Sequence, residues 1–356
     1  MRFEKSTRRY ERWLARHLDI IEADLRLKHR QMAEGVFPFL RATYYRWAAI
    51  WPEVCSHLMS APVVLAVGDL HVENFGTWRD SDGRLVWGVN DFDEAYDLPY
   101  TNDLVRLATS AQLASDHLSL TGEDACAAIL EGYGAAIAKG GEPFVLEEKH
   151  AWLRKAAVSD LRDPVKFWGK LDGLKPVDGG VPKEVRKALR RALPEPDLAF
   201  EIYHRIAGLG SLGRPRYLAV ADWCGGKVAR EAKVLAPSAC SFVAGGDRGE
   251  RIRYGEITQR AVRVPDPFLF MCGDWIVRRL APACARIELE ELAKKRDEGR
   301  LLHAMGFETA NIHLGTRRAG KAIRRDLAKR KPDWLLQAAS SMSKAVRADW
   351  REWRAR

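Results

Sequence analysis

The chain has 356 residues, of which 47% are hydrophobic and 30% are charged, and its formal net charge at pH 7 is +10. This composition is that of a folded protein with one large core or two smaller ones, and it excludes a largely disordered chain. The longest apolar run, APVVLAV, is shorter than the roughly 20 residues of a membrane helix, and the charged N-terminus has no signal-peptide pattern. We therefore expect a cytoplasmic protein that binds no membrane, and the positive charge favours anionic partners.

The N-terminal part of the chain is predicted to be mainly helical. Amphipathic patterns indicate two helices and apolar patterns indicate two strands, in the order helix 7–32, helix 37–54, strand 62–67 and strand 83–93. A long helix follows, which Thr101 or Asn102 is suited to cap. We expect residues 1–168 to form a helical lobe that contains two strands.

The rest of the chain divides into three segments. Glycine, proline and lysine are frequent in residues 169–197, which indicates a linker around one short basic helix. Short strand patterns separated by glycines follow in residues 198–254, and residues 255–356 are predicted to be helical throughout. From Arg317 onward there are 13 Lys and Arg, 4 Asp and Glu, and three tryptophans. This basic end suits nucleic acid, although amphipathic helices whose tryptophans dock on a core have the same pattern.

Four polar residues follow the two predicted strands. Asp69 comes directly after the first strand and Asn74 five residues later, and Asp91 and Asp93 end the second strand. Carboxylate and amide oxygens are suitable ligands for Mg²⁺, which usually shares its coordination shell with waters and substrate phosphates. Asp and Asn also favour turns, so each residue alone has a simpler explanation. Together they favour a magnesium-assisted phosphate site.

The segments GDLHVENFG and VNDFDEA, with DLPYTNDLVRLA after them, resemble the catalytic and metal-binding segments of aminoglycoside-phosphotransferase-like and other protein-kinase-like enzymes. The resemblance implies that Asp69 is the catalytic carboxylate, which orients the substrate hydroxyl or accepts its proton. It also implies that Asn74 and Asp91 bind the metal ion and that Asp103 is a structural acid at the start of the next helix.

Some residues of these segments allow two interpretations. Val67 stands where kinase-like enzymes have a histidine, and His71 lies inside the loop. His71 is a candidate catalytic residue, but an orienting or packing role also explains it. Asp93 and Glu94 are candidate ligands of a second metal ion, whereas a solvated acidic edge is the simpler alternative.

The segment GLGSLG contains Gly208, Gly210, Ser211 and Gly213 and matches the pattern G-x-G-x-x-G. The alternating segment RPRYLAVADW follows it and predicts a strand, whereas a dinucleotide-binding loop would open a helix. The residues CGG then predict a hairpin turn. Strand, glycine loop, strand, turn and strand is the order of the kinase nucleotide lobe, where the loop covers the phosphates of ATP. An ordinary glycine-rich hairpin would give the same pattern.

The glycine loop comes about 140 residues after Asp69, whereas in protein kinases it precedes the catalytic loop. A circular permutation explains this order, because permuted chains keep their packed elements. The segments FPFLRATYYRW, GDLHVENFG, NDFDEA, RIAGLGSLGRPRY and REAKVLAPSA resemble the bacterial family numbered 2252 among the domains of unknown function. The resemblance implies an α+β, protein-kinase-like bilobal fold, circularly permuted, with a largely helical C-lobe and a small antiparallel-sheet nucleotide lobe.

A kinase nucleotide lobe needs a cation on the strand after the hairpin, where it binds the nucleotide phosphates. The family has Lys-Glu-Ala at this place, whereas this chain has REA at residues 230–232. Because side chains alternate along a strand, Arg230 and Lys233 point to opposite faces of the sheet. We favour Arg230 over Lys233 as the phosphate-binding cation, with Glu256 in the helical pattern RYGEITQRAVR as its partner carboxylate.

Together these features predict an ATP- and Mg²⁺-dependent phosphotransferase that acts on a hydroxyl group of a small molecule or a protein. Two alternatives stay open. The same site could transfer AMP instead of phosphate, or the arginine at residue 230 could mark a pseudokinase that binds nucleic acid through the basic C-terminal end.

Overall fold

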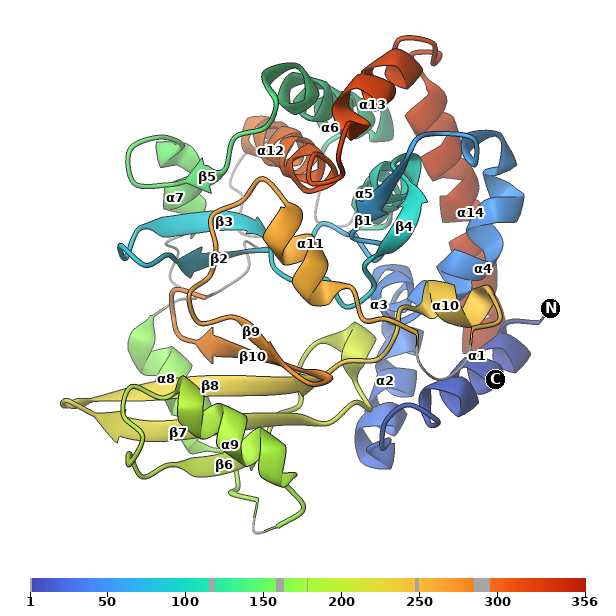
Figure 1. The fold of residues 1–356 in the computed structure, drawn as a ribbon. Helices are drawn as coiled ribbons and strands as arrows, with labels where there is room; N and C mark the ends of the chain where they lie inside the picture. Colours follow the sequence, from blue (N-terminus) through green and yellow to red (C-terminus); the bar gives the residue numbers. More distant parts are fainter. Residues whose placement is uncertain (1, 115–118, 158–162, 178, 247–249, 285–294) are drawn as a thin grey trace.

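The computed structural model describes residues 2–114, 119–157, 163–177, 179–246, 250–284 and 295–356. It divides into a large, mainly helical body and a smaller part built on a five-stranded sheet, which lies at the lower left in Figure 1. Both parts mix helices with small antiparallel sheets, so the expected α+β class is confirmed. No helix of the described residues is long and apolar enough to cross a membrane.

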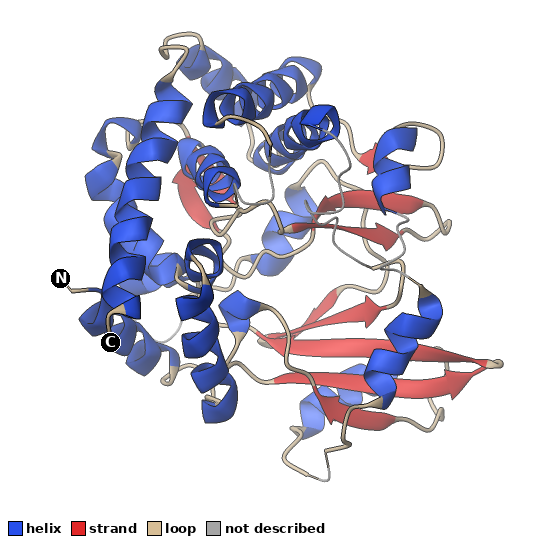
Figure 2. Ribbon diagram, turned by 180° about the vertical axis from the view of Figure 1, so that it is seen from behind, coloured by secondary structure: helices blue, strands red, loops and turns tan. Residues whose placement is uncertain are grey.

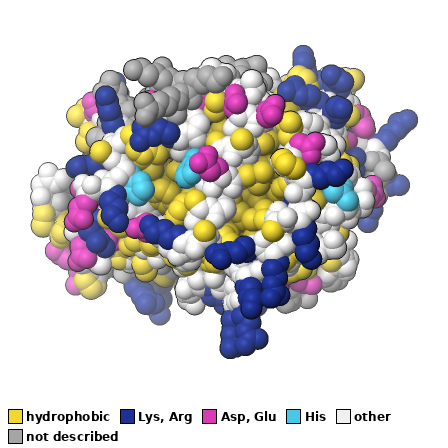
Figure 3. Space-filling model, turned by 90° about the horizontal axis from the view of Figure 1, so that it is seen from above, with side chains coloured by type: hydrophobic (Ala, Val, Ile, Leu, Met, Phe, Trp, Pro, Cys, Tyr) yellow, Lys and Arg dark blue, Asp and Glu magenta, His cyan; other side chains and the backbone are white. Residues whose placement is uncertain are grey.

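The helical body contains most of the buried hydrophobic side chains of the described residues. Its helices are α1 (Phe3–Leu14), α2 (Glu22–Glu34), α3 (Val36–Ala42), α4 (Tyr44–Val54), α5 (Thr101–Leu113), α6 (Gly122–Lys139), α7 (Ala151–Ala157), α10 (Ala239–Val243), α11 (Tyr254–Arg260), α12 (Lys295–His313), α13 (Ala319–Leu327) and α14 (Trp334–Arg354). Helix α12 packs along α6, and α14 packs along α5. The face around α6 and α12 has hydrophobic side chains gathered in a hollow, lined among others by Phe144, Trp152 and Phe307 (Figure 3).

Each of the two helices predicted at the N-terminus is divided into two helices in the structure. The single helix expected over residues 7–32 is two helices, because the chain between α1 and α2 turns aside and Ile21 N donates a hydrogen bond to the carbonyl of Gly213. The helix expected over residues 37–54 is also divided, at Thr43. Helix α5 begins at Thr101 as expected, but neither Thr101 nor Asn102 caps it, since their side chains bond to Leu58 and Trp47 instead.

Five short strands lie in the first half of the chain, where two were expected. Strand β1 (Val63–Ala66) pairs with β4 (Tyr96–Pro99), and β3 (Leu85–Val89) pairs with both β2 (Phe75–Arg79) and β5 (Phe144–Val145), all in antiparallel register. The two expected strands are β1 and β3. Strands β2, β4 and β5 have two to five residues each and lack the apolar run that predicted β1 and β3, so only tertiary pairing defines them.

The smaller part is an antiparallel sheet in the order β6–β7–β8–β10–β9. Its strands are β6 (Glu201–His204), β7 (Arg216–Trp223), β8 (Gly226–Val234), β9 (Phe270–Cys272) and β10 (Trp275–Leu280). The predicted strand, glycine loop, strand, turn and strand are confirmed, with Cys224 and Gly225 at positive φ in a two-residue hairpin turn. The expectation of helix throughout residues 255–356 is wrong for β9 and β10, which extend the sheet beyond residue 254.

Two helices pack on the sheet, one inside the expected linker 169–197 and one that begins before it. The basic helix α9 (Lys183–Ala192) is confirmed, and its apolar residues Val185 and Leu189 are buried against one face of the sheet. Helix α8 (Pro164–Asp172) packs Phe167 and Trp168 on the other face (Figure 2). The segment is therefore part of the smaller unit, since its hydrophobic stripe needs the sheet for burial.

The two ends of the chain lie side by side. Helices α1 and α14 are in contact, and Phe3 N donates a 3.0 Å hydrogen bond to Glu352 Oε1 (Figure 1). Trp334 and Trp353 of the basic C-terminal end are buried in the core, and Arg330 and Arg356 lie over their outer faces. Trp334 and Trp353 therefore dock on the core, as the alternative of amphipathic helices expects.

Candidate functional site

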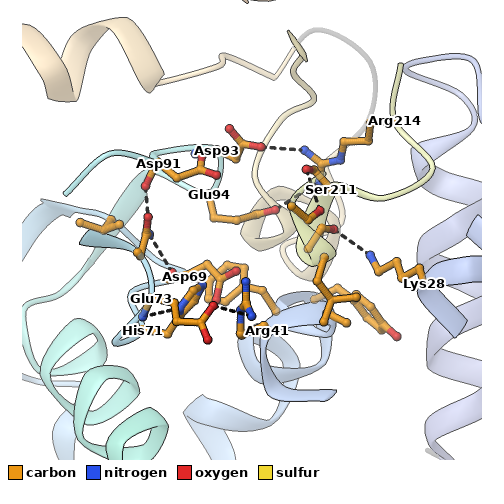
Figure 4. Close-up of a pocket in the computed structure, with 18 of the residues that line it drawn as sticks. Lys28, Arg41, Asp69, His71, Glu73, Asp91, Asp93, Glu94, Ser211 and Arg214 are labelled. Carbon is orange, nitrogen blue, oxygen red and sulfur yellow. Dashed lines mark hydrogen bonds and ion pairs between the residues drawn. The ribbon is translucent and has the colours of Figure 1, made fainter. Parts of the chain in front are cut away.

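The loops after β1 and β3 meet the glycine loop in a pocket at the boundary between the two parts of the molecule (Figure 4). Asp69, Asn74, Asp91, Asp93, Gly208, Gly210 and Ser211 line it, although their positions in the sequence are far apart. The water-accessible volume is about 70 Å³. It is large enough for several water-sized groups but not for a whole nucleotide.

A buried acid holds the loop that carries Asp69. The Asp103 carboxylate accepts hydrogen bonds from Val67 N at 2.7 Å and from Gly68 N at 3.0 Å, and His313 Nε2 lies 3.1 Å from it. Gly68 has φ of 81°, and a Cβ atom there would lie 2.4 Å from the carbonyl oxygen of Glu94. The predicted structural role of Asp103 is thus confirmed, and the loop geometry depends on glycine at residue 68.

Arg106 fixes one oxygen of the Asp69 carboxylate. Its Nε and Nη2 atoms lie 3.1 Å and 2.5 Å from Asp69 Oδ1, and its guanidinium stacks on the Trp47 ring at 4.7 Å from the centroid. Burial raises the pKa of Asp69, and Arg106 opposes this shift. Asp69 Oδ2 accepts no hydrogen bond from the described residues and faces the glycine loop near Gly210. One oxygen of the carboxylate is therefore held while the other is open to a ligand.

Asn74 connects the two loops. Its Nδ2 atom donates to the carbonyl oxygens of Asp69 and Asp91, at 3.1 Å each. Its Oδ1 atom is buried without a hydrogen-bond partner among the described residues. A buried oxygen without a partner is unfavourable, so a cation or a water molecule at this position would satisfy it.

Asp91 and Asp93 share a cation from the sheet. Lys233 Nζ lies 3.0 Å from Asp91 Oδ1 and 2.6 Å from Asp93 Oδ1. Burial opposes ionisation of Asp91, but the Lys233 ammonium outweighs it and holds the pKa of Asp91 well below its usual range. Burial and the neighbouring Asp91 raise the pKa of Asp93 to about 6. The pair thus combines one firmly ionised carboxylate with one that titrates near neutral pH.

The prediction that Arg230, rather than Lys233, faces the phosphate site is wrong. Arg230 donates to the carbonyl of Ala192 in α9 at 2.7 Å and lies over the Phe268 ring, on the face of the sheet away from the pocket. Alternation correctly placed Arg230 and Lys233 on opposite faces. It could not show which face α9 covers, and that packing turns Lys233 toward the acids.

The partner predicted for this cation is wrong as well. Glu256 lies on α11 and pairs with Arg253 at 2.6 Å and with Arg260 at 2.8 Å, away from both Arg230 and Lys233. Glu231, the buried carboxylate of β8, forms ion pairs with three arginines, namely Arg216 and Arg278 of the sheet and Arg205, which follows β6.

The glycine loop lies directly over Asp69. Leu209–Ser211 form a short 3₁₀ turn, and a Cβ atom at Gly210 would lie 3.0 Å from the carbonyl oxygen of Arg41. Ser211 Oγ accepts a 2.7 Å hydrogen bond from Arg216, so Ser211 braces the loop against the sheet. At Gly213, a Cβ atom would lie 3.3 Å from Leu25 of α2. The loop is thus packed closely on two sides.

His71 also lines the pocket. Its Nδ1 atom accepts a hydrogen bond from Glu73 N at 3.2 Å, and its ring packs edge-on against Phe37. These contacts support an orienting role for His71, while a chemical role stays a prediction.

Four further residues of this region were not predicted as site residues from the sequence, except that Glu94 was a candidate ligand of a second metal ion. They are Lys28, Arg106, Arg214 and Glu94. Arg106 follows Asp103 by three residues, about one helical turn, so the sequence could have placed both on the same face of the helix. Lys28 and Arg214 stand among many other cations, and only their burial distinguishes them.

The donor set fits Mg²⁺ in part. Among the residues that the structure describes, no three His, Cys, Asp or Glu side chains converge on a metal position. Asn74 and Asp91 both line the pocket, and Asn74 Nδ2 lies 3.1 Å from the Asp91 carbonyl oxygen. Asn74 Oδ1 and the Asp91 carboxylate could hold the ion, with waters and phosphate oxygens as the remaining ligands, as is usual for Mg²⁺.

Comparison with known proteins identifies one family. Residues 20–163 match the model of a family described as an uncharacterized protein conserved in bacteria (DUF2252). The expected resemblance to this bacterial family is confirmed over these residues, which include Asp69, Asn74, Asp91 and Asp103. No curated protein matches the chain. No solved structure matches it either.

Proposed function

We propose that the chain is an ATP- and Mg²⁺-dependent phosphotransferase with a circularly permuted, protein-kinase-like arrangement. The observation that carries the proposal is the meeting of Asp69, Asn74 and Asp91 with the glycine loop in one pocket, together with the ion pair of Lys233 and Asp91. Kinase-like enzymes need these parts together, namely a carboxylate for the hydroxyl, ligands for the metal, and a cation and a loop for the phosphates.

Asp69 is the residue that would act on the acceptor. Arg106 holds Oδ1, so Oδ2 is free to orient the acceptor hydroxyl and to take its proton as the oxygen attacks phosphorus. The new oxygen–phosphorus bond then forms while the bond from the γ-phosphorus to the bridging oxygen breaks, and ADP leaves. The raised pKa of Asp69 makes it a stronger base than an exposed aspartate.

The remaining residues would bind and position the nucleotide. Asn74 and Asp91 would hold Mg²⁺, which neutralises phosphate charge when it is bound. Lys233 would exchange part of its ion pair with Asp91 and Asp93 for contacts with phosphate oxygens. Because the pocket is small, the glycine loop must move away from Asp69 to admit the nucleotide.

Isothermal titration calorimetry with ATP in the presence and absence of Mg²⁺ tests the proposal. We expect binding that depends on Mg²⁺ and that Asp91→Ala removes, while the exposed control Asp82→Asn binds as the wild type does. Wild-type protein that binds no ATP in the presence of Mg²⁺ would refute the proposal.

Labelled ATP then identifies the reaction. Transfer of label from the γ-position to an acceptor supports phosphate transfer, whereas transfer from the α-position supports the alternative reaction, transfer of AMP.

A further inference from the structure

Lys28 is a buried cation without an acidic partner in the described part of the chain. It lies on α2, on the face that packs against the glycine loop, and the residue is 7% exposed. Its Nζ atom donates to the carbonyl oxygen of Gly210 at 2.8 Å, and this is its only hydrogen bond among the described residues. A buried ammonium group has three donors and needs further acceptors, which a neutral carbonyl does not supply.

Arg214 and Arg41 bring further donors to the same pocket. Arg214 is 5% exposed and donates to Tyr10 OH at 3.2 Å and to Glu94 Oε1 at 3.4 Å. Its Nη1 atom lies 3.6 Å from Asp93 Oδ2, beyond hydrogen-bond distance, and its Nε atom has no hydrogen-bond acceptor among the described residues. Arg41 pairs with Glu73 at 2.6 Å, and its Nε atom also has no acceptor there. Buried N–H groups are nearly always paired in folded proteins, so these donors indicate a ligand.

We propose that Lys28, Arg214 and Arg41 form a subsite for an oxyanion beside Asp69, and that this oxyanion belongs to the acceptor. The acceptor would then be an alcohol that also carries a phosphate group. This proposal rests on the proposed function for the role of the hydroxyl, but the oxyanion subsite itself does not depend on it.

The position of the subsite favours the acceptor over the nucleotide. In Figure 4 Lys28 lies across the pocket from Asp91 and Asp69, whereas Arg214 reaches toward Asp93, 3.6 Å from it. The nucleotide phosphates would lie on the side of Asp91 and Lys233. A ligand whose hydroxyl lies at Asp69 Oδ2 would therefore extend its other end toward Lys28.

Size and charge agree with this assignment. The pocket as a whole, with a water-accessible volume of about 70 Å³, has room for a group with a few oxygen atoms. Arginine and lysine together are the usual side chains for phosphate recognition.

Calorimetry with inorganic phosphate tests the subsite. The variant Lys28→Met keeps the length of the side chain and removes its charge, and Arg30→Met changes an exposed cation on the same helix as a matched control. We expect phosphate binding to weaken at least tenfold in Lys28→Met and by less than twofold in Arg30→Met. Lys28→Arg should restore most of the binding, and circular dichroism shows whether each variant is folded.

Titration of the same variants with ATP and Mg²⁺ separates the two sources of the oxyanion. An unchanged ATP affinity in Lys28→Met supports the acceptor as the source. Equal losses of phosphate and ATP binding would overturn that assignment and make Lys28 a nucleotide contact. Wild-type phosphate binding without any ATP binding would refute the proposed function but leave the subsite. Phosphate affinity that Lys28→Met does not change, or wild-type protein that binds no phosphate, would overturn the subsite.

Discussion

The substitution Lys28→Met is expected to stabilise the protein at neutral pH. Burial, with Arg214 as the next cause, lowers the pKa of Lys28 from 10.5 to about 8. At about 1.4 kcal/mol per pKa unit, the protonated side chain lowers the free energy of unfolding by about 3 kcal/mol. Methionine removes this term but loses the hydrogen bond to Gly210, which contributes about 1 kcal/mol. The expected gain is about 2 kcal/mol at pH 7.

The gain should depend on pH in a direction that the sign of the shift decides. The pKa of Lys28 is lower in the folded than in the unfolded protein, so the stability associated with its neutral form is present above pH 10.5 and is lost as the pH falls through about 8. The advantage of Lys28→Met is therefore full below pH 8 and falls to near zero by pH 10.

Urea denaturation of wild type and variant at pH 7 and pH 10 measures this difference. Arg30→Met, with its exposed side chain, should differ from the wild type by less than about 0.5 kcal/mol at both values. The reasoning would be refuted if Lys28→Met were less stable than the wild type at pH 7. It would also be refuted if the free energies of unfolding of variant and wild type differed by the same amount at both pH values. A stabilising loss of charge would also fit a residue kept for binding rather than for folding.

Three further predictions concern the loops after β1 and β3. Asp69→Asn should lower phosphate transfer by about 10²- to 10⁴-fold with little change in ATP affinity, and an unchanged rate would remove Asp69 from the chemistry. Gly68→Ala should lower the free energy of unfolding by more than about 2 kcal/mol, because residue 68 combines positive φ with a close approach to a carbonyl oxygen. Gly83→Ala, at similar φ in open space, should lower it by about 1 kcal/mol, and equal losses in urea denaturation would contradict this. Because the pKa of Glu94 is raised to about 7, the stability of its protonated form is lost as the pH rises through 7, so Glu94→Gln should gain stability over the wild type between pH 5 and pH 8. A difference in stability between Glu94→Gln and the wild type that does not change with pH would contradict the raised pKa of Glu94.

Local sequence patterns were informative where one element carries the whole signal. Strands β1 and β3 are apolar and end in acids, so Asp69 and Asp91 were expected at strand ends, and the structure places them there. The hairpin of β7 and β8 followed from alternation and the turn residues. Strands β9 and β10 were missed because they lie in a region predicted to be helical. They join the sheet through tertiary pairing, β10 with β8 and β9 with β10.

Local patterns did not predict all of the residues around the pocket. Arg106 lies on a helix one turn after Asp103, but its contact with Asp69 requires α5 to pack behind the β1 loop. Lys28 and Arg214 resemble the other cations of a basic chain, and only burial separates them from solvated side chains.

The sequence by itself determined the α+β class, the acidic residues of the candidate site and the opposite facing of Arg230 and Lys233. These depend on composition, on strand ends and on alternation along one strand, which are properties of neighbouring residues. Only the tertiary structure decided that Lys233 and not Arg230 meets the acids, and that Lys28 faces the glycine loop. The reason is that helix α9 covers one face of the sheet and helix α2 covers the loop, and packing between distant segments leaves no trace in the local pattern.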